Sequence, residues 1–357
     1  MSAEGFGKRE LSFSERLARS IAGGGPISLS HYMAQANTQY YAMRDPLGAA
    51  GDFTTAPEIS QMFGEMIGLC LADIWQRTGQ AQMPYYVELG PGRGTLAADA
   101  LRAMEQARLA PVAHLVETSP VLRAQQRIRV QHAHFHDAVE TLPRDRPLLI
   151  VANEFFDALP IQQAVKTEAG WREMMVGLGQ DTPFAPVVGE RPADARIPEA
   201  LRDAPDGSIY ESCPAGAAIM LELAYRLQKQ GGAMIVIDYG YAGPALGDTL
   251  QALCNHQYTN VFDNAGGVDL TAHVDFSMLA AAAQQGGLTT YGPTAQGDFL
   301  TRLGIHARAQ SLARGTPDKA RDIETALTRL VSPEQMGTLF KVMMAMHPAW
   351  PVPEGFA

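Results

Sequence analysis

The sequence is 357 residues long, which is enough for a large hydrophobic core and suggests about two domains. Its 28 basic and 38 acidic side chains leave a formal charge of −10, which argues against a nucleic acid as the main partner, because phosphate binding needs a basic surface. The three cysteines share no metal-ligand spacing and no apolar run approaches the length of a membrane span, so we expect no metal site and no membrane span.

The beginning of the sequence favours a cytoplasmic location. The first twenty residues contain no apolar signal region, and they include Glu4, Glu10 and Glu15, whereas a transit peptide is poor in acidic residues. An odd number of cysteines without metal-ligand spacing is consistent with reduced thiols in a cytosol-like compartment. We therefore predict a cytoplasmic protein.

The first eighty residues are predicted to form helices joined by one long loop. Apolar residues at helical spacing indicate helices over residues 12–22 and 58–75, and a serine-capped helix is predicted within residues 27–36. The segment 40–57 is rich in turn formers, aromatic residues and hydroxyl groups, and it is too long for a simple connection. Loops of this composition often carry function, so we expect this one to contribute to a site.

The middle of the chain alternates between short apolar runs and helical patterns. The predicted strands cover residues 85–89, 112–116, 134–136 and 148–152. The predicted helices between them cover residues 96–108 and 120–130. Alternation at this spacing predicts parallel strands joined by right-handed crossovers, which is an α/β fold.

The pattern changes after residue 160. A β-hairpin is predicted around Ala169-Gly170, followed by a proline-rich stretch over residues 183–205. A helix at 215–230 and a buried parallel strand at 233–238 then resume the earlier alternation. An irregular stretch, a helix ending at residue 285 and a strand at 288–291 follow, and the segment 299–346 is predicted to be helical with apolar residues in the core.

The predicted chemistry centres on the turn after the first parallel strand, Glu-Leu-Gly-Pro-Gly-Arg-Gly. Gly90, Gly92 and Gly94 allow positive φ and leave no Cβ between the chain and a ligand. A glycine-rich turn from a parallel strand into a helix binds nucleotide-like ligands in doubly wound folds. Glu117 ends the next strand, where a carboxylate accepts hydrogen bonds from ribose hydroxyls.

Glu88 helps to distinguish between cofactor classes. It stands two residues before the first glycine, and the G-x-G-x-G spacing differs from the dinucleotide pattern that binds a pyrophosphate. A carboxylate at the mouth of the turn disfavours a pyrophosphate and favours a cation. S-adenosylmethionine (SAM) carries a sulfonium and an ammonium, so the charge pattern favours SAM over NAD. A surface carboxylate at a strand end is the alternative interpretation.

Polar side chains also follow the fourth strand. Asn153 and Glu154 are expected to face the same crevice as the glycine turn, because ligands lie beyond the carboxyl ends of parallel strands. Asp157 lies three residues later, and in a helical turn its carboxylate would point to the same side as that of Glu154. Two carboxylates suit a planar guanidinium. Alternatively, Asn153 caps a turn and Glu154 pairs with a lysine.

Other candidates are weaker. Asp137 and Ala138 end the third strand and could read an adenine edge, although a surface turn explains them nearly as well. His256 and His273 are possible bases, but a single histidine is more often packed or solvated. No serine or cysteine lies in the elbow motif of a nucleophile–base triad.

Several stretches between residues 13 and 346 match a known family pattern, namely residues 25–27, 40–41, 51–60, 63–65, 88–96, 153–160, 238–240 and 269–276. Through them the sequence resembles the MidA-like family of SAM-dependent methyltransferases, found in bacteria and mitochondria. The resemblance implies a class I, Rossmann-like fold with a mostly parallel sheet. It also implies that the chain is related to mitochondrial protein arginine methyltransferases that assist the assembly of respiratory complex I. The stretch after Leu250 lacks the family's basic residues, which leaves the substrate preference open.

The resemblance also implies roles for individual residues. The glycine turn would contact the methionine part of SAM, Glu117 the ribose, and Asp137 with Ala138 the adenine. Asn153 and Glu154 would face the methyl group and the acceptor. The full set of implied cofactor contacts is Thr54, Thr55, Glu88, Gly90, Gly92, Gly94, Glu117, Asp137, Ala138 and Asn153.

Together these observations predict a methyltransferase core with additions that form an acceptor-binding lobe. The expected division is a helical cap at 1–80, a core at 81–160 and 211–300, a hairpin insertion at 161–210 and a C-terminal helical segment at 301–357. The predicted reaction is methylation of an arginine on a protein, with a complex I-type subunit as the expected acceptor, Glu154 polarising the guanidinium and Asp157 assisting. A small-molecule methyltransferase, an NAD-dependent enzyme and a SAM-binding assembly factor with little catalysis stay open, as does the oligomeric state.

Overall fold

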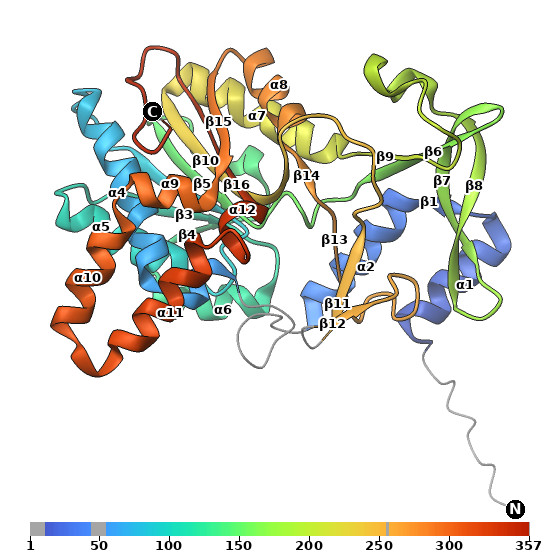
Figure 1. Ribbon diagram of the computed structural model, residues 1–357, viewed down its shortest axis with the longest axis horizontal. Coiled ribbons are helices and arrows are strands. Elements are labelled where there is room, and N and C mark those ends of the chain that lie inside the picture. The colour runs from blue at the N-terminus through green and yellow to red at the C-terminus, as the bar shows by residue number, and fades with distance from the viewer. Residues whose placement is uncertain (1–10, 44–54, 255–256, 357) are drawn as a thin grey trace, which may run out of the picture.

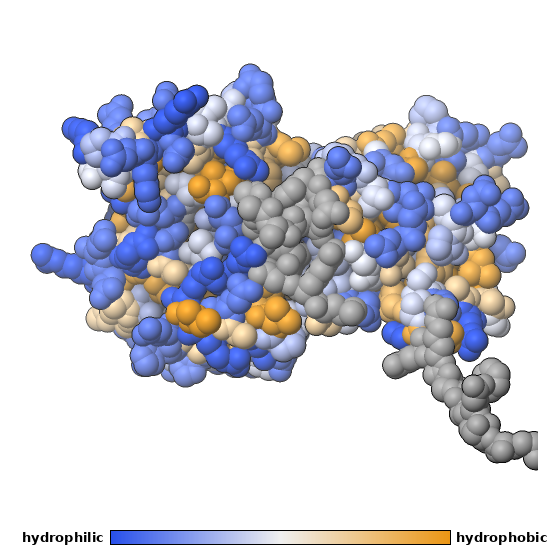
Figure 2. Space-filling view, turned by 90° about the horizontal axis from the view of Figure 1, so that it is seen from below, coloured by the Kyte–Doolittle hydropathy of each residue, from blue (hydrophilic) through white to orange (hydrophobic). Residues whose placement is uncertain are grey.

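The computed structural model describes residues 11–43, 55–254 and 257–356. Figure 1 shows two parts side by side: a larger part built on a central sheet with helices on both faces, and a smaller part, at the right, that contains α1, α2 and β6–β8. Hydrophilic residues predominate on the face shown in Figure 2, with smaller hydrophobic areas between them. No helix within the described residues is both long enough and apolar enough to cross a membrane.

The larger part contains an eight-stranded sheet whose main path runs β15-β16-β10-β5-β2-β3-β4, with β14 paired to β10. These strands are β2 (Tyr85–Leu89), β3 (Val112–Val116), β4 (His134–His136), β5 (Leu148–Asn153), β10 (Gly232–Tyr241), β14 (Val274–Asp275), β15 (Thr289–Ala295) and β16 (Phe340–Met346). The five strands from β10 to β4 pair in parallel, whereas β16 runs antiparallel between β10 and β15. The chain moves outward from β2 to β4 and then returns to β5 on the other side of β2, which places a topological switch point between β2 and β5.

The central strands are apolar on both faces because helices cover both faces. In β5, Leu149 and Val151 point into one core cluster, and Leu148, Ile150 and Ala152 point into the other. The first cluster is closed by α4 (Gln61–Arg77), α5 (Thr95–Gln106), α9 (Gln296–Arg302), α10 (Ile305–Gly315) and α11 (Ala320–Val331). The second is closed mainly by α7 (Pro214–Gln230) and α8 (Phe276–Gln285).

The smaller part is an antiparallel sheet packed against two helices. Its order is β1-β7-β6-β9, with β8 paired to β7, and a separate three-stranded sheet has the order β12-β11-β13. The strands are β1 (Ile27–Ser28), β6 (Gln162–Thr167), β7 (Gly170–Leu178), β8 (Phe184–Pro192), β9 (Ile209–Ser212), β11 (Gln251–Cys254), β12 (Gln257–Thr259) and β13 (Asp269–Thr271). The helices are α1 (Phe13–Gly24) and α2 (Leu29–Met43). Tyr32 and Met33 of α2 pack with Phe184 of β8 in a core of their own.

Most of the predicted elements are confirmed, including the parallel strands, the hairpin around Gly170 and the class I arrangement. The predicted helical segment 299–346 is wrong at its end, where residues 340–346 form β16. Leu339, Val342, Met343 and Met346 have helical spacing, but the run is apolar almost throughout, and burial between β10 and β15 favours a strand. The stretches predicted to be proline-rich or irregular likewise contain β8, β11 and β12.

The first eighty residues contribute to both parts of the molecule. β1 pairs with β7, and α2 packs in the core of the smaller part, whereas α4 packs along α5 in the larger part. The proposed boundaries of the domains stay a prediction. What matters for the site is that α2 reaches from the smaller part to the carboxyl ends of the parallel strands.

Candidate functional site

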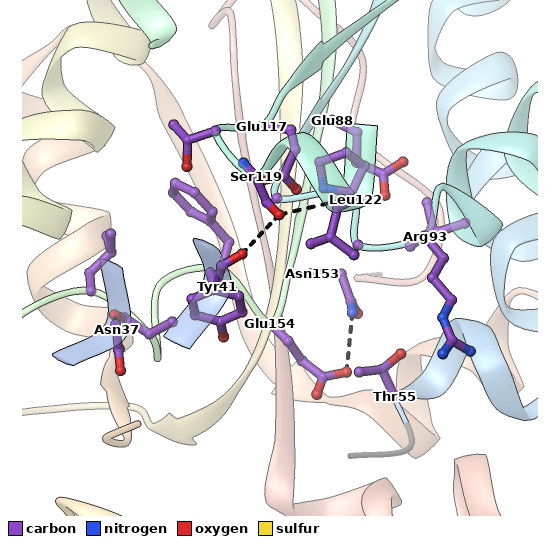
Figure 3. Close-up of a pocket in the computed structure, with 18 of the residues that line it drawn as sticks. Asn37, Tyr41, Thr55, Glu88, Arg93, Glu117, Ser119, Leu122, Asn153 and Glu154 are labelled. Carbon is purple, nitrogen blue, oxygen red and sulfur yellow. Dashed lines mark hydrogen bonds between the residues drawn. The ribbon is translucent and has the colours of Figure 1, made fainter. Parts of the chain in front are cut away.

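A cavity of ≈ 480 Å³ lies at the switch point, bordered by the ends of β2, β3 and β5 and by one face of α2. Figure 3 shows side chains from these segments converging on it. The sequence-predicted residues that line it are Thr55, Glu88, Gly90, Gly92, Glu117, Asn153 and Glu154. Sequence reasoning therefore located the glycine turn and the strand ends in the cavity wall, although these residues are more than sixty positions apart in the chain.

The glycine turn joins β2 to α5 in a conformation that other residues rarely adopt. The φ angles of Gly90, Gly92 and Gly94 are 58°, 54° and 81°. Gly90 and Gly92 line the cavity. Gly94 is the N-cap of α5, and a Cβ on it would lie 3.4 Å from side-chain atoms of Gln126 and Val130. Its place in the structure is explained by packing against α6 (Pro120–Arg129), and its predicted cofactor contact stays a prediction.

Glu88 is a buried carboxylate in the cavity wall. Its side chain is 3% exposed, which excludes the alternative of a surface carboxylate. The Tyr86 hydroxyl donates to its Oε2 at 2.5 Å. Burial raises the pKa of Glu88 to about 8, against the effect of this hydrogen bond. A carboxylate held this way is stabilised by a cation entering the cavity.

Glu117 ends β3 and is fixed by neighbouring donors. The backbone N–H of Ser119 donates to its Oε1 at 2.8 Å, and the Gln126 amide donates to its Oε2 at 3.3 Å. The Ser119 hydroxyl in turn donates to the carbonyl oxygen of Tyr41 at 2.9 Å, which ties this strand end to α2 (Figure 3). Burial raises the pKa of Glu117, and the bonds from Ser119 and Gln126 counteract the increase.

Glu154 follows β5 directly and has a left-handed backbone conformation, with φ of 49°. Its N–H donates to the carbonyl oxygen of Ile237 in β10 at 2.9 Å. The Asn153 amide donates to Glu154 Oε1 at 3.2 Å, as Figure 3 shows. Burial, and then the negative charge of Asp157, raise the pKa of Glu154 to about 8. This environment also favours a positively charged partner.

Asp157 is buried but does not line the cavity. Its carboxylate accepts a hydrogen bond from the side chain of Tyr239 in β10, and burial raises the pKa of Asp157 to about 6. The structure therefore does not bring Asp157 and Glu154 together on the cavity wall. Asp157 acts on Glu154 through its charge, and its predicted assistance to the acceptor stays a prediction.

The remaining predicted residues lie in different places. Asp137 is mostly exposed and forms an ion pair with Arg123 at 2.7 Å, and neither it nor Ala138 lines the cavity, so their adenine contact stays a prediction. Thr55 is the N-cap of the short helix α3 (Ala56–Ile59). His273 packs edge-on against Tyr239 and is not a lining residue. Thr54 and His256 lie outside the described residues.

Several cavity residues were missed by sequence reasoning. Asn37 donates to the carbonyl oxygens of Ala158 and Leu270 at 3.0 and 2.8 Å, and it accepts from the Leu270 N–H at 3.0 Å. Nothing in the sequence signals Asn37, because its partners are 121 and 233 residues away. Tyr41, whose hydroxyl donates to Asp269 at 2.8 Å, lies in one of the matched stretches and could have been found.

Arg93 and Glu58 were also missed, although both lie in matched stretches. Both line the cavity, and Arg93 Nη1 lies 3.6 Å from Glu58 Oε2. The Thr95 hydroxyl donates to Glu58 Oε1 at 2.5 Å. These contacts connect the start of α5 to α3, so the segment that follows the N-terminal loop is held against the glycine turn.

A family model described as "Putative S-adenosyl-L-methionine-dependent methyltransferase" matches residues 66–294, more than half of the chain. The chain belongs to this family. The predicted class I fold and the predicted cofactor are thereby confirmed, and the NAD-dependent alternative is wrong.

Individual relatives resemble this methyltransferase over most of its length. The protein arginine methyltransferase NDUFAF7, mitochondrial, of Danio rerio is 34% identical, and the match covers 95% of this chain and 87% of that protein. The protein of the same name from Homo sapiens is 34% identical over 91% of this chain and 81% of that protein. A crystal structure of a superfamily member from Burkholderia thailandensis, bound to S-adenosyl-homocysteine, is 28% identical with a TM-score of 0.85, covering 100% of this chain and 98% of that chain.

These relatives contradict one prediction. The cytoplasmic location inferred from the first twenty residues is contradicted by the relatives from Danio rerio, Drosophila melanogaster and Homo sapiens, all of which are named as mitochondrial proteins. Composition near one end of a chain is a weak signal compared with similarity over its whole length.

The cavity residues of the methyltransferase fit SAM. Two buried carboxylates, Glu88 and Glu117, have oxygens in the wall, and cations and hydroxyl groups are the partners that such oxygens need. Gly90 and Gly92 present backbone without side chains beside them. Among the described residues, no group of histidine, cysteine and carboxylate side chains is arranged to hold a metal ion.

Proposed function

We propose that this methyltransferase transfers the methyl group of SAM to an arginine side chain of a protein. The relatives that match 91–95% of the chain are named protein arginine methyltransferases. The match to the first of these leaves only 5% of the chain uncovered. This is shorter than the N-terminal cap, the hairpin insertion or the C-terminal segment, so the similarity extends into each of these three additions to the core. Similarity confined to the core would support only a shared cofactor, whereas the additions are where an acceptor-binding lobe is expected.

The observation that carries the proposal is the placement of Glu154. It lines the same cavity as the glycine turn, and its carboxylate receives a hydrogen bond from Asn153. A guanidinium offers a planar set of N–H donors that match a carboxylate in two parallel hydrogen bonds. A cationic acceptor group bound here would relieve the cost of burying the charge of Glu154.

Glu154 would act by orientation and by accepting a proton. SAM supplies an electrophilic methyl group on a positively charged sulfur when it is bound. In the transfer one sulfur–carbon bond breaks, one nitrogen–carbon bond forms, and the guanidinium nitrogen gives up a proton, which Glu154 takes. Burial, which raises the pKa of Glu154 to about 8 when no cation is beside it, makes this carboxylate a better proton acceptor than an exposed one. Alignment of the nitrogen with the methyl group provides most of the rate enhancement.

The acceptor protein is the finer part of the proposal. The resemblance to proteins that assist complex I assembly suggests a respiratory subunit of that type. Two alternatives lead to different outcomes in one experiment: a small-molecule methyltransferase labels the low-molecular-weight fraction, and a SAM-binding assembly factor labels nothing. A lysate of source cells lacking the enzyme, incubated with the purified protein and methyl-labelled SAM, distinguishes all three.

The expected result is labelled protein, with mass spectrometry placing the label on arginine. Glu154→Gln is expected to bind S-adenosylhomocysteine with nearly unchanged affinity and to lose about 10²–10⁴-fold in transfer rate, because the proton acceptor is gone while the cofactor contacts remain. Calorimetry and the rate of label incorporation provide the two measurements. Unchanged transfer by Glu154→Gln would remove this residue from the mechanism, and label on lysine or in small molecules would refute the assignment to arginine.

A further inference from the structure

Asp238 is a carboxylate buried in the sheet behind the site. It lies near the end of β10 and is 0% exposed. Its Oδ2 accepts the backbone N–H groups of Phe156 at 3.0 Å and Asp157 at 3.3 Å, and its Oδ1 accepts the N–H of Tyr239 at 3.1 Å. Burying a carboxylate is costly, and an apolar residue would serve the core better, so the position needs an explanation other than packing.

Two of the three donors belong to the turn that presents Glu154. Residues 154–157 leave β5 with Glu154 in the left-handed region, which side-chain-bearing residues disfavour. Such conformations persist only where the surroundings impose them. Here two adjacent residues of β10 hold both sides of the turn. The Ile237 carbonyl oxygen accepts from the N–H of Glu154. The Asp238 side chain accepts from the N–H groups of Phe156 and Asp157.

The arrangement is that of a hydrogen-bond acceptor in a backbone concavity. Successive N–H groups after a left-handed residue point in a common direction and bind negative charge. In this protein the acceptor is the Asp238 side chain of the neighbouring strand rather than a ligand. Burial, and then the charges of Asp157 and Glu154, raise the pKa of Asp238, and the bonds from Asp157 and Phe156 counteract the increase. Replacing one of the Asp238 oxygens with a donor would leave at least one of the bonded N–H groups without its acceptor and would weaken the restraint that keeps Glu154 in its unfavourable conformation.

We propose that Asp238 is a positioning residue for methyl transfer, which orients Glu154 into the cavity by holding the backbone of residues 154–157. This inference rests on the proposed role of Glu154. Asp238 itself does not line the cavity and touches neither the glycine turn nor Glu117 through a hydrogen bond found in the described residues. Its loss therefore affects transfer through Glu154 and leaves the cofactor contacts in place.

The test is a double-mutant cycle between Asp238→Asn and Glu154→Gln. The asparagine has the same shape, but only its one oxygen accepts hydrogen bonds, so its NH₂ group must face either the N–H of Tyr239 or the N–H groups of Phe156 and Asp157. Asp238→Asn alone is expected to lower label incorporation into lysate protein by about 10²-fold, because small displacements of a reacting group have effects of this size. Affinity for S-adenosylhomocysteine, measured by calorimetry, is expected to stay within about threefold, and in the Glu154→Gln background Asp238→Asn is expected to add less than about threefold.

Glu65→Gln is the matched control. Glu65 is also a buried carboxylate, but its partners are Arg308 and Arg102 on other helices, so its effect on transfer is expected to be the same with and without Glu154→Gln. A loss from Asp238→Asn that is equally large in both backgrounds would overturn the proposal. So would a crystal structure of Asp238→Asn in which Glu154 keeps its position.

A second pair of variants covers the case in which Asp238→Asn is poorly folded. Glycine adopts the left-handed region without penalty, so adding Glu154→Gly to Asp238→Asn is expected to raise its melting temperature. An unchanged or lower melting temperature would show that Asp238 does not restrain this turn. The melting temperatures and the crystal structure can be measured without an acceptor. They therefore test the role of Asp238 even if the wild-type protein methylates no arginine. That outcome would refute the proposed function but not the restraint of the turn by Asp238.

Discussion

At the level of single residues, the site is marked by two carboxylates that accept hydrogen bonds from neutral side chains. Glu88 and Glu154 receive side-chain hydrogen bonds from Tyr86 and Asn153, and burial raises the pKa of each to about 8. Both positions were predicted from the sequence, because polar residues at the ends of apolar parallel strands have no role in a core. Their burial and hydrogen bonds were not predictable, because these depend on segments far away in the chain.

Glu88→Gln is expected to weaken SAM binding by about tenfold to a hundredfold, since a hydrogen bond to a charged group contributes roughly 1.5–3 kcal/mol. The affinity of the wild-type protein is also expected to rise between pH 6.5 and 8.5. Below its raised pKa Glu88 is protonated, and it must lose this proton before its negative charge can interact with a cationic ligand. Calorimetric titration across this range gives both results. Glu222→Gln on α7, a carboxylate paired with Arg226, is the control and is expected to bind normally. A pH-independent affinity would contradict the assignment.

At the level of secondary-structure elements, parallel pairing brings histidines together at the edge of the sheet. β3 and β4 place His114 opposite His134, and His114 Nδ1 lies 2.9 Å from His136 Nε2. Burial, and then the charges of His136 and His134, lower the pKa of His114 to about 4. The strands themselves were predicted from the sequence, but the register that stacks these rings follows only from the pairing.

The expected consequence is a loss of stability in acid. The unfolded chain protonates His114 below about pH 6.5, whereas the folded chain does so only near pH 4, so the folded state loses about 3 kcal/mol relative to the unfolded state as the pH falls through this window. His114→Gln removes this dependence. Denaturant unfolding at several pH values, compared between the two proteins, is expected to show a steeper acid loss for the wild type. His31→Gln on α2 is the control, and parallel curves for His114→Gln and wild type would contradict the prediction.

For the whole molecule, α2 links the smaller part to the catalytic core. Asn37 bonds to Ala158 after β5 and to Leu270 in β13, and Tyr41 bonds to Ser119 and to Asp269. These contacts join segments that are separated by up to 233 residues in the chain. The cavity exists only because both parts contribute to its wall.

Asn37→Ala is expected to lower the free energy of unfolding by about 1–3 kcal/mol and to weaken SAM binding, because buried backbone groups of Ala158 and Leu270 lose their partners. Chemical denaturation and calorimetry measure the two effects. Thr38→Ala is the matched control for stability: Thr38 lines the same cavity, but it is exposed and its hydroxyl bonds within α2, so little change in the free energy of unfolding is expected. Equal losses of stability from the two substitutions would show that Asn37 does not join the two parts.

The alternating apolar runs, the glycine turn and the carboxylate Glu88 beside it were enough to predict the parallel sheet, the cofactor and the part of the cavity wall that the strand ends form, because strand direction and the ends of parallel strands follow from local pattern. The placement of β16 between β10 and β15, the burial of Asp157 away from the cavity and the contacts of Asn37 with Ala158 and Leu270 were not predictable in this way. Each depends on which distant segments pack together. The sequence of an apolar run with helical spacing, or of a helix with a polar residue, is the same whichever distant segment packs against it.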